Sequence, residues 1–335
     1  MHESALRDSE HGAGGRGAEV PSCSATPASR SSGRWRRLFR PRADSLTRDP
    51  SALAPATGVV AGRPAPGVLE IHLEGGARRN VLGRSTISRI EMLVASPPPD
   101  ARVILITAEP PDFCAGYDLF EAYASGAEPL IAHEANFRQL RISSLPVVAA
   151  LHGRVIGGGI ELALAADVRL GAPDTLMSIP AAKLGLVYSA SGLRLLVDEL
   201  GESVVRAMVL GGRRLTAADA LAVGGLSEIV PPEELRDRSL ALASTIASWP
   251  ASATANNRRV LDVISGRAEG DTAELRKTGF SDGGALATRI EQFVAEHGQP
   301  RLPPHSRSTS VLAPGLEMIR RFRHRAGRHQ RPRHA

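Results

Sequence analysis

The chain has 335 residues, of which 42% are hydrophobic and 4% aromatic, and its formal net charge is +6. The charge is uneven, because residues 1–50 hold 9 Arg against 6 acidic residues and residues 301–335 hold 9 Arg against 1, which leaves the segment between them at net −5. An acidic body argues against a nucleic-acid-binding surface on the folded domain, since such a surface needs clustered Lys and Arg. The two basic ends remain candidates for an anionic partner.

Two cysteines, Cys23 and Cys114, are too few for a disulfide scaffold. The chain has no apolar run of about 18 residues that could span a membrane, and its N-terminus lacks the apolar core of a signal peptide. Nearly all basic residues are Arg, as in proteins from GC-rich bacterial genomes. We therefore expect a cytoplasmic bacterial protein.

The chain begins and ends with segments that lack a periodic apolar pattern. Residues 1–62 are rich in Ser, Gly, Pro and Arg, and residues 303–335 end in an Arg/His run. Such segments cannot bury enough apolar surface to offset their ordering entropy, so we expect both to be disordered. The basic and aromatic run Arg34–Arg40 could contact an anionic surface, but a functionless extension is the plainer interpretation.

Residues 63–200 show the pattern of an α/β core. Val68 to Leu73 alternates like a strand, and Ser85 to Ala95 has helical spacing with Ser85 as its N-cap. Arg102 to Thr107 and Val147 to Leu151 are nearly continuous apolar runs, typical of strands that are covered on both faces. Strands alternating with helices predict right-handed crossovers.

Residues 201–302 are predicted to be a helical C-terminal region. The segments with helical spacing are Val204–Leu210, Ala217–Ala222, Glu233–Ser248 and Ala253–Ile264.

Two glycine-containing segments carry the strongest functional signal. Asp112–Leu119 reads D-F-C-A-G-Y-D-L, and its small residues would let the backbone approach a ligand closely. Leu151–Leu162 reads L-H-G-R-V-I-G-G-G-I-E-L, in which a strand is followed by three glycines and a helix. Glycines at a helix N-terminus expose N–H donors to an anion. A glycine triplet alone is more often a tight turn than a binding site.

The pair of segments, in this order and at this separation, resembles the crotonase (enoyl-CoA hydratase/isomerase) superfamily, whose patterns are F-x-A-G-x-D-L and G-x-x-x-G-G-G-x-E-L. The resemblance spans residues 66–300, where Arg79–Leu82 is similar to the R-N-A-L turn, Pro180–Gly185 to P-x-x-x-x-G, and Gly212–Ala220 to G-R-x-x-x-A-x-E-A. It implies a crotonase-like spiral of ββα turns with a helical C-terminal trimerisation region, and trimers that often pair into hexamers.

The resemblance also implies an acyl-CoA-processing enzyme. By it, the backbone N–H groups of Tyr117 and Gly158 form an oxyanion hole for the thioester oxygen, and Glu161 is an acid/base group. Coenzyme A enters as part of the substrate, and no metal or further cofactor is expected. The residues implied to line the coenzyme A channel are Arg79, Val81, Ala115, Asp118, Leu119, Pro180, Ala181 and Gly185.

One position departs from the pattern of a hydratase. Hydration of a conjugated double bond uses two carboxyl groups, and Glu161 matches the first, but Ala181 stands where the second follows Pro180. Isomerases of the family commonly use that second position too. Tyr188 stands where methylmalonyl-CoA-decarboxylase-like members carry a tyrosine, although a loop tyrosine packed on Leu186 or Val187 is the plainer interpretation.

Three functions therefore remain open at this point. The first is lyase or isomerase chemistry on an enoyl-CoA, the second is decarboxylation of a malonyl-type thioester, and the third is a catalytically silent acyl-CoA-binding protein.

Overall fold

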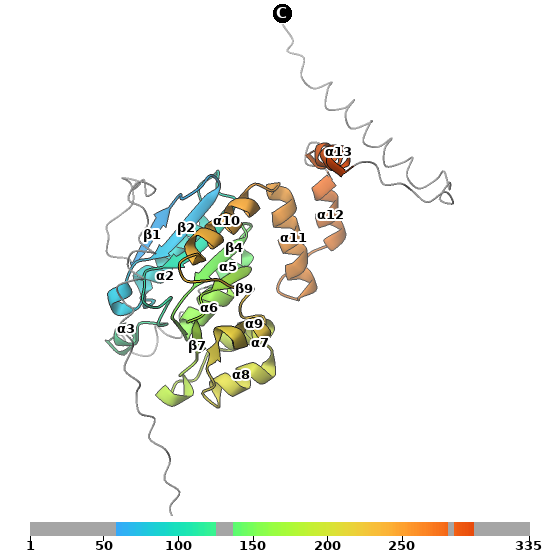
Figure 1. The fold of residues 1–335 in the computed structure, drawn as a ribbon. Helices are drawn as coiled ribbons and strands as arrows, with labels where there is room; N and C mark the ends of the chain where they lie inside the picture. The colour runs from blue at the N-terminus through green and yellow to red at the C-terminus, as the bar shows by residue number, and fades with distance from the viewer. Residues whose placement is uncertain (1–57, 125–136, 281–284, 298–335) are drawn as a thin grey trace, which may run out of the picture. The chain divides into compact units, whose positions relative to one another are not determined.

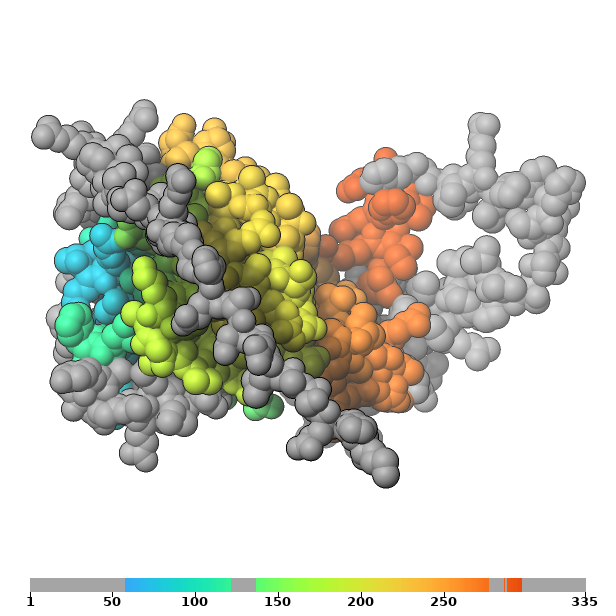
Figure 2. Space-filling model, turned by 90° about the horizontal axis from the view of Figure 1, so that it is seen from below, coloured from blue at the N-terminus to red at the C-terminus, as the bar shows by residue number. Residues whose placement is uncertain are grey.

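The structure is a computed structural model that describes residues 58–124, 137–280 and 285–297, which are coloured in Figure 1 and, apart from a few near their ends, in Figure 2. Most of the predicted N-terminal extension, with its basic and aromatic run, and the whole predicted tail 303–335 lie outside the described residues. Among the residues that are described, no helix is long and apolar enough to cross a membrane.

The larger of two β-sheets has six strands in the order β1-β2-β3-β4-β6-β9. All neighbours are parallel except β1 and β2. Every residue of β2, β3 and β4 is buried, as their apolar runs predict for strands covered on both faces. The strands are β1 (Val59–Gly62), β2 (Val68–Leu73), β3 (Val103–Ala108), β4 (Val147–Leu151), β6 (Val168–Gly171) and β9 (Glu228–Ile229).

Strand β1 corrects the predicted end of the N-terminal extension. Residues 59–62 were expected to be disordered, but they pair antiparallel with β2, with Val59 opposite Leu73 and Gly62 opposite Glu70. A four-residue edge strand has too little pattern of its own to be recognised. Its order comes from pairing with β2 along an otherwise exposed edge.

Alternate residues of the sheet face two different helical layers. Leu69, Ile71 and Leu73 of β2 belong to an apolar core with residues of α2 (Arg84–Ala95), α5 (Arg138–Ile142) and α6 (Gly158–Leu164). On the other face, Val68 packs in a second core with α10 (Leu235–Ala247), which contacts β2, β3, β4 and β6. The sheet thus lies between α10 on one face and the helices α2, α5 and α6 on the other (Figure 1).

A second, three-stranded sheet in the order β5-β7-β8 was not predicted. Its strands are only two or three residues long: β5 (Arg154–Ile156), β7 (Leu176–Ser178) and β8 (Leu215–Thr216). Strand β5 connects the large sheet to α6, so this small sheet fixes the position of the three glycines.

The predicted helices are present to within a few residues, with one error at a cap. Helix α2 begins at Arg84 with Gly83 as its N-cap, so Ser85 lies inside the first turn and does not cap the helix. The remaining helical elements are η1 (Gly76–Arg78), α3 (Leu119–Ala124), η2 (Ala182–Leu184), α7 (Ala190–Leu200), α8 (Glu202–Val209), α9 (Ala217–Ala222), α11 (Ala251–Ile264), α12 (Thr272–Phe280) and α13 (Ala285–His297).

The region 201–302 is also not purely helical. It contributes β8 to the small sheet and β9 to the large one, and α10 covers the large sheet. The predicted boundary at residue 200 therefore does not separate two independent cores, because tertiary pairing places two short strands after it.

Candidate active site

The two glycine-containing segments lie against each other. Cys114 pairs with Val155 in a parallel bridge, and the Ile156 N–H donates to the Cys114 carbonyl over 2.9 Å. Gly116 has a φ of 88°, and a methyl group on it would lie 2.6 Å from the Ile156 carbonyl oxygen and 3.4 Å from the Gly158 nitrogen. Only glycine fits this approach, so residues 116 and 117 are held beside the start of α6.

The start of α6 is equally tight. Gly157 is the N-cap with a φ of 50°, and Gly158 is the first helical residue. A methyl group on Gly158 would lie 2.6 Å from the Tyr117 ring, and one on Gly159 would lie 2.7 Å from the Cys114 carbonyl oxygen. The first N–H groups of a helix have no acceptor within the helix. The fold thus brings together the two residues predicted to form the oxyanion hole, although their role remains a prediction.

A cavity of about 140 Å³ opens at this point. Of the predicted site residues, eight line it: Ala115, Tyr117, Leu119, Gly158, Glu161, Pro180, Ala181 and Tyr188. Its other lining residues are Gly116, Ile156, Gly157, Leu184, Leu186, Val187 and Ser189.

Four predicted channel residues do not line this cavity. Val81 is half-buried. Arg79 forms an ion pair with Asp112 at 3.1 Å and its carbonyl accepts from the Ala115 N–H. Asp118 forms an ion pair with Arg78 at 2.7 Å and accepts from the N–H groups of residues 120 and 121. Both side chains therefore shape the segment that leads to Tyr117.

The fourth such residue is Gly185, which ends η2 with a φ of 73° and so turns the chain toward Tyr188.

Asn80, which lies next to Arg79 in the Arg79–Leu82 turn, was not predicted to be a site residue. It is buried, and its side-chain amide donates to the carbonyls of Glu109 at 2.7 Å and Asp112 at 2.8 Å. Its side-chain oxygen accepts from the Gly75 N–H. Asn80 thereby ties the Arg79–Leu82 turn to the loop that carries Asp112. Its φ of 54° lies in the left-handed region, which Asn adopts more readily than most residues.

Glu161 is the central acid/base candidate. Its carboxyl is buried on α6 and accepts a hydrogen bond from the Tyr188 hydroxyl over 2.6 Å. Burial raises the pKa of the Glu161 carboxyl, and hydrogen bonds from Tyr188 and Tyr117 oppose this shift only in part. A raised carboxyl pKa favours proton exchange near neutral pH.

The two phenols around Glu161 stay protonated. Burial and the neighbouring carboxylate raise the pKa of both Tyr117 and Tyr188. The Tyr117 ring lies against Gly158, as predicted for a ring packed at the pocket mouth. Tyr188, however, is more than a loop residue packed on its neighbours, because its hydroxyl contacts Glu161 while Val187 is 98% exposed.

Among the described residues that line this cavity, Glu161 carries the only carboxyl group, and Ala181 occupies the second position. Its side chain is buried, lines the cavity and precedes η2. The wall formed by residues 181, 184 and 186 is apolar.

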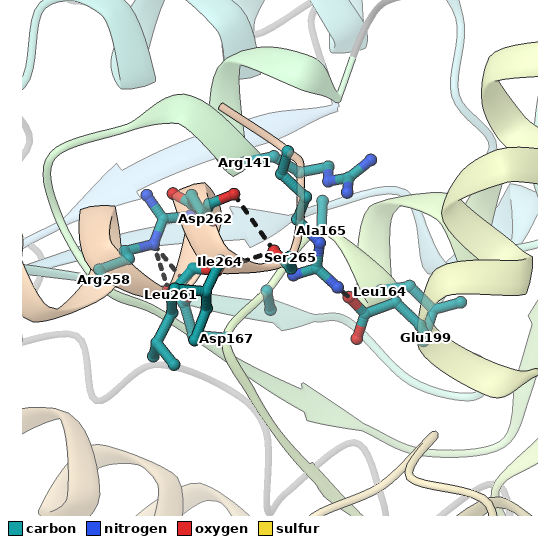
Figure 3. Close-up of a pocket in the computed structure, with 12 residues that line it drawn as sticks. Arg141, Leu164, Ala165, Asp167, Glu199, Arg258, Leu261, Asp262, Ile264 and Ser265 are labelled. Carbon is teal, nitrogen blue, oxygen red and sulfur yellow. Dashed lines mark hydrogen bonds and ion pairs between the residues drawn. The ribbon is translucent and has the colours of Figure 1, made fainter. Parts of the chain in front are cut away.

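A second cavity, of about 500 Å³, lies on another side of Glu161 and was not predicted. It is formed by α5, α7 and the end of α11, which are far apart in sequence, so no local pattern could reveal it. A further cavity of about 380 Å³ adjoins it (Figure 3). There Arg258 of α11 contacts Asp167 over 2.8 Å and 3.0 Å and donates to the Leu140 carbonyl, which fixes α11 to the core.

Known proteins identify the family. The family model described as enoyl-CoA hydratase/isomerase matches residues 65–289. Carnitinyl-CoA dehydratase from Salmonella arizonae is 36% identical over 52% of this chain and 69% of its own length. A Mycobacterium bovis protein named probable enoyl-CoA hydratase is 34% identical over 59% of this chain and 80% of its own length.

Solved structures agree with this assignment. An enoyl-CoA hydratase/isomerase family protein from Hyphomonas neptunium superposes with a TM-score of 0.65 and 26% identity, over 71% of this chain and 95% of that one. The fold is thus that of the crotonase superfamily, as the sequence patterns predicted. The chain belongs to the enoyl-CoA hydratase/isomerase family of acyl-CoA-processing enzymes.

Proposed function

We propose that the protein moves a proton next to the carbonyl group of a coenzyme A thioester, in a lyase or isomerase reaction on an enoyl-CoA. The observation that carries this proposal is the position of Glu161. Its buried carboxyl lines the cavity into which Tyr117 and Gly158 also face, and Tyr188 holds it by a 2.6 Å hydrogen bond. Glu161 also favours an enzyme over a silent binding protein, because burying a carboxyl is costly.

In this mechanism the thioester oxygen accepts hydrogen bonds from the backbone N–H groups of Tyr117 and Gly158. Negative charge grows on that oxygen as the enolate forms, and each such donor contributes about 3 kcal/mol to transition-state stabilisation. Glu161 removes a proton from one carbon of the acyl group. It then delivers that proton to another atom of the acyl group, which is a second carbon in an isomerase reaction. Coenzyme A is part of the substrate, and we include no other cofactor in the proposal.

The single carboxyl group bears on the type of reaction. Glu161 is the only carboxyl group among the described residues that line the cavity, so in this proposal it acts both as base and as acid. A proton shift between two carbons suits one such group, because the proton returns from the group that removed it. Elimination or addition of water requires Glu161 to serve both steps in turn.

Decarboxylation is a second candidate, supported by a separate observation. The wall of the cavity at Ala181, Leu184 and Leu186 is apolar. A substrate carboxylate placed there would lose solvation, which favours loss of CO₂ into the same enolate. In that reaction Glu161 is not needed as a base.

A panel of thioesters distinguishes these candidates. The purified protein is incubated with 2-enoyl-, 3-enoyl-, 3-hydroxyacyl- and malonyl-type CoA thioesters, and products are identified by mass. We expect isomerised or hydrated products that Glu161→Gln reduces by ~10²-fold or more. Glu202→Gln, on the exposed surface of α8, is the matched control. Turnover of malonyl-type thioesters alone, insensitive to Glu161→Gln, would support the decarboxylase instead.

We also propose a homotrimer or a hexamer built from it. The helices after residue 250 expose large apolar side chains, which a second copy of the chain would cover. The most exposed are Leu261, Ile264 and Phe293. Light scattering coupled to gel filtration should give a mass of three or six chains, and a monomer would contradict this part of the proposal.

A further inference from the structure

The cavity behind Glu161 has an unusual lining for a site that receives an acyl chain. We call it the arginine cavity, because four arginines line it: Arg138, Arg141, Arg194 and Arg267. We infer that it receives an acyl group ending in a carboxylate, so that the substrate is a CoA monothioester of a dicarboxylic acid. This inference rests on the proposed function and specifies its substrate class.

The arginine cavity is placed to receive the far end of the acyl group. Glu161 lines both this cavity and the smaller one that contains Tyr117 and Gly158. A thioester carbonyl bound at Gly158 would put its reacting carbons beside Glu161. The remainder of the acyl group would then extend past Glu161 into the arginine cavity.

Positive charge exceeds negative charge in the lining. The acidic residues that line the arginine cavity are Glu161, Asp198 and Asp262, against four arginines. Asp198 pairs closely with Arg194, and Glu199, which lies outside the lining, pairs with Arg267. The charge that a further anionic group would meet is therefore that of Arg141, whose own contact with Asp198 is longer.

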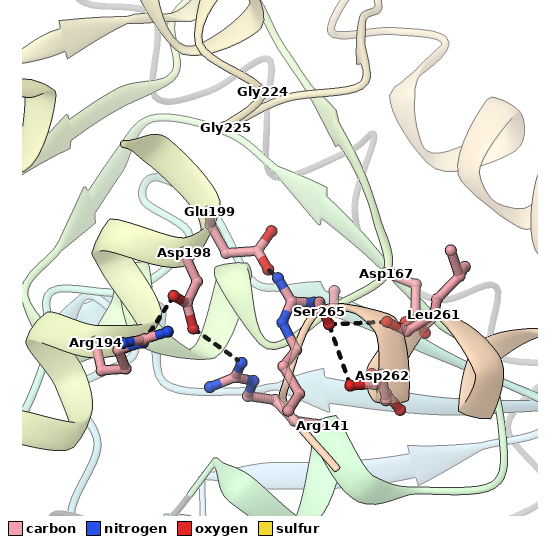
Figure 4. A network of polar contacts seen from close by, with 12 residues as sticks. Arg141, Asp167, Arg194, Asp198, Glu199, Gly224, Gly225, Leu261, Asp262 and Ser265 are labelled. Atoms are coloured by element: carbon pink, nitrogen blue, oxygen red, sulfur yellow. Dashed lines mark hydrogen bonds and ion pairs between the residues drawn. The ribbon is translucent and has the colours of Figure 1, made fainter. Parts of the chain in front are cut away.

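Arg141 has the geometry of a residue that awaits such a group. Its side chain is 23% exposed, and its contact with Asp198 is long, at 3.9 Å. The other Asp198 oxygen is held by Arg194 at 2.8 Å, so the two guanidinium groups share one carboxylate (Figure 4). At 3.9 Å the contact between Arg141 and Asp198 is an ion pair that is too long for a hydrogen bond.

The surroundings of Arg141 make this incomplete pairing costly. Burial and the like charge of Arg267 lower the pKa of Arg141, and Arg267 itself is paired with Glu199. A substrate carboxylate could accept two parallel hydrogen bonds from the Arg141 guanidinium and offset that repulsion. A purely hydrocarbon chain would leave these charges desolvated, and a cationic chain would be repelled by them.

The test is a binding comparison that needs no turnover. Dissociation constants are measured by calorimetry for glutaryl-CoA and pentanoyl-CoA, which have the same number of acyl carbons and differ in the terminal carboxylate. We expect glutaryl-CoA to bind roughly 10- to 100-fold more tightly, as a charge-assisted hydrogen bond allows. Arg141→Met should remove this preference by weakening glutaryl-CoA binding alone. Arg141→Lys should retain only part of it.

Arg206→Met is the matched control, because Arg206 pairs with Glu202 on the exposed face of α8 and does not line the arginine cavity. It should leave both dissociation constants unchanged. Equal binding of the two thioesters, or a preference that survives Arg141→Met, would overturn the inference. Binding of neither thioester would overturn it as well. If glutaryl-CoA is preferred but no enoyl-CoA is converted, the proposed reaction fails while the inference about the acyl group stands.

Discussion

The two walls of the small cavity differ in how they are built. One wall is backbone: Gly116 and Gly158 approach their neighbours so closely that an added methyl group would lie 2.6 Å from another atom in each case. The other wall is the segment from Pro180 to Ser189, where Ala181 and Tyr188 face inward but Leu184 and Val187 are largely exposed. The first wall is sterically determined, whereas the exposed side chains of Leu184 and Val187 in the second are not confined by neighbouring atoms.

This difference assigns the two walls different tasks. A closely packed backbone wall can hold N–H donors in fixed positions, which is what stabilisation of an enolate requires. Side chains on the opposite wall decide where the proton or a leaving group goes next. We call the backbone wall around Gly116 and Gly158 the glycine wall, and the Pro180–Ser189 segment the 180–189 wall. We therefore expect changes in the glycine wall to abolish the reaction, and changes in the 180–189 wall to alter its rate or its product.

The largest effect should come from Gly158→Pro. Proline is tolerated at the first position of a helix but removes the N–H that meets the thioester oxygen. We expect turnover of any accepted thioester to fall about 10³-fold. Gly158→Ala is the control, because it keeps the N–H while crowding the Tyr117 ring. A Gly158→Pro variant that melts like the wild type and remains fully active would show that this N–H has no catalytic role.

A smaller loss is expected for Gly192→Ala, on α7. The added methyl group would lie 2.8 Å from the Tyr188 ring and 3.0 Å from a Glu161 oxygen. The methyl group would also lie 2.8 Å from the Ser189 hydroxyl, which caps α7 by accepting from the N–H of residue 192. These side chains must shift to admit it, so the hydrogen bond between Tyr188 and Glu161 is disturbed. We expect kcat to fall by about tenfold, the value of roughly one hydrogen bond. An unchanged kcat would mean that the pair is not required in this arrangement.

Tyr188→Phe should lower activity less and shift its pH dependence. The hydroxyl stabilises the charged form of Glu161, so its loss leaves burial less opposed and raises the pKa of that carboxyl further. If the ionised carboxylate is the base, the acidic limb of the kcat/KM profile moves to higher pH. The kcat/KM profile of each variant is measured from about pH 5 to about pH 9, and a shift of the acidic limb by ~1 pH unit would be large. A shift to lower pH would contradict this assignment.

The smallest expected effect is a gain. Ala181→Glu places a second carboxyl in the wall opposite Glu161, where Ala181 is buried and lines the cavity. Two nearby carboxyls raise the pKa of one of them, so that one can act as acid while the other acts as base. We expect slow hydration of crotonyl-CoA to appear or increase, and Glu161→Gln in the same chain to remove the gain.

The wild type provides the counter-test of that gain. If the unaltered protein already hydrates crotonyl-CoA at ~10 per second, a rate typical of enzymes, and Ala181→Glu adds nothing, then position 181 does not control the reaction.

The sequence predicted the parts of the molecule that depend on local pattern. The strands Val68–Leu73 and Val147–Leu151 have the bounds expected from their apolar runs, and helix Ala217–Ala222 does too. Strands β5, β7 and β8 were missed because two or three residues carry no periodicity. Pairing with distant segments, not local preference, determines those strands.

The site divides in the same way. The two glycine-containing segments were noticed because close backbone approach restricts the residue type and leaves a pattern in the chain, and it was the resemblance to the family that predicted Tyr117 and Gly158 to lie in one site. The contact between Tyr188 and Glu161, 27 positions apart, depends on how η2 and α7 turn back over α6, and residue spacing alone does not encode that path. The arginine cavity was missed for the same reason, since Arg141, Arg194 and Arg267 come from three separate elements.

Exchange of the α-hydrogens of a saturated acyl-CoA in D₂O, followed by mass spectrometry, tests most directly whether Glu161 and the Gly158 N–H support enolate formation. Exchange requires the enolate and a proton carrier but no later step. The account predicts deuterium uptake with the wild type, and its loss in both Glu161→Gln and Gly158→Pro while Glu202→Gln exchanges normally. Uptake that persists in Glu161→Gln, or no uptake by the wild type of any thioester it binds, would contradict it.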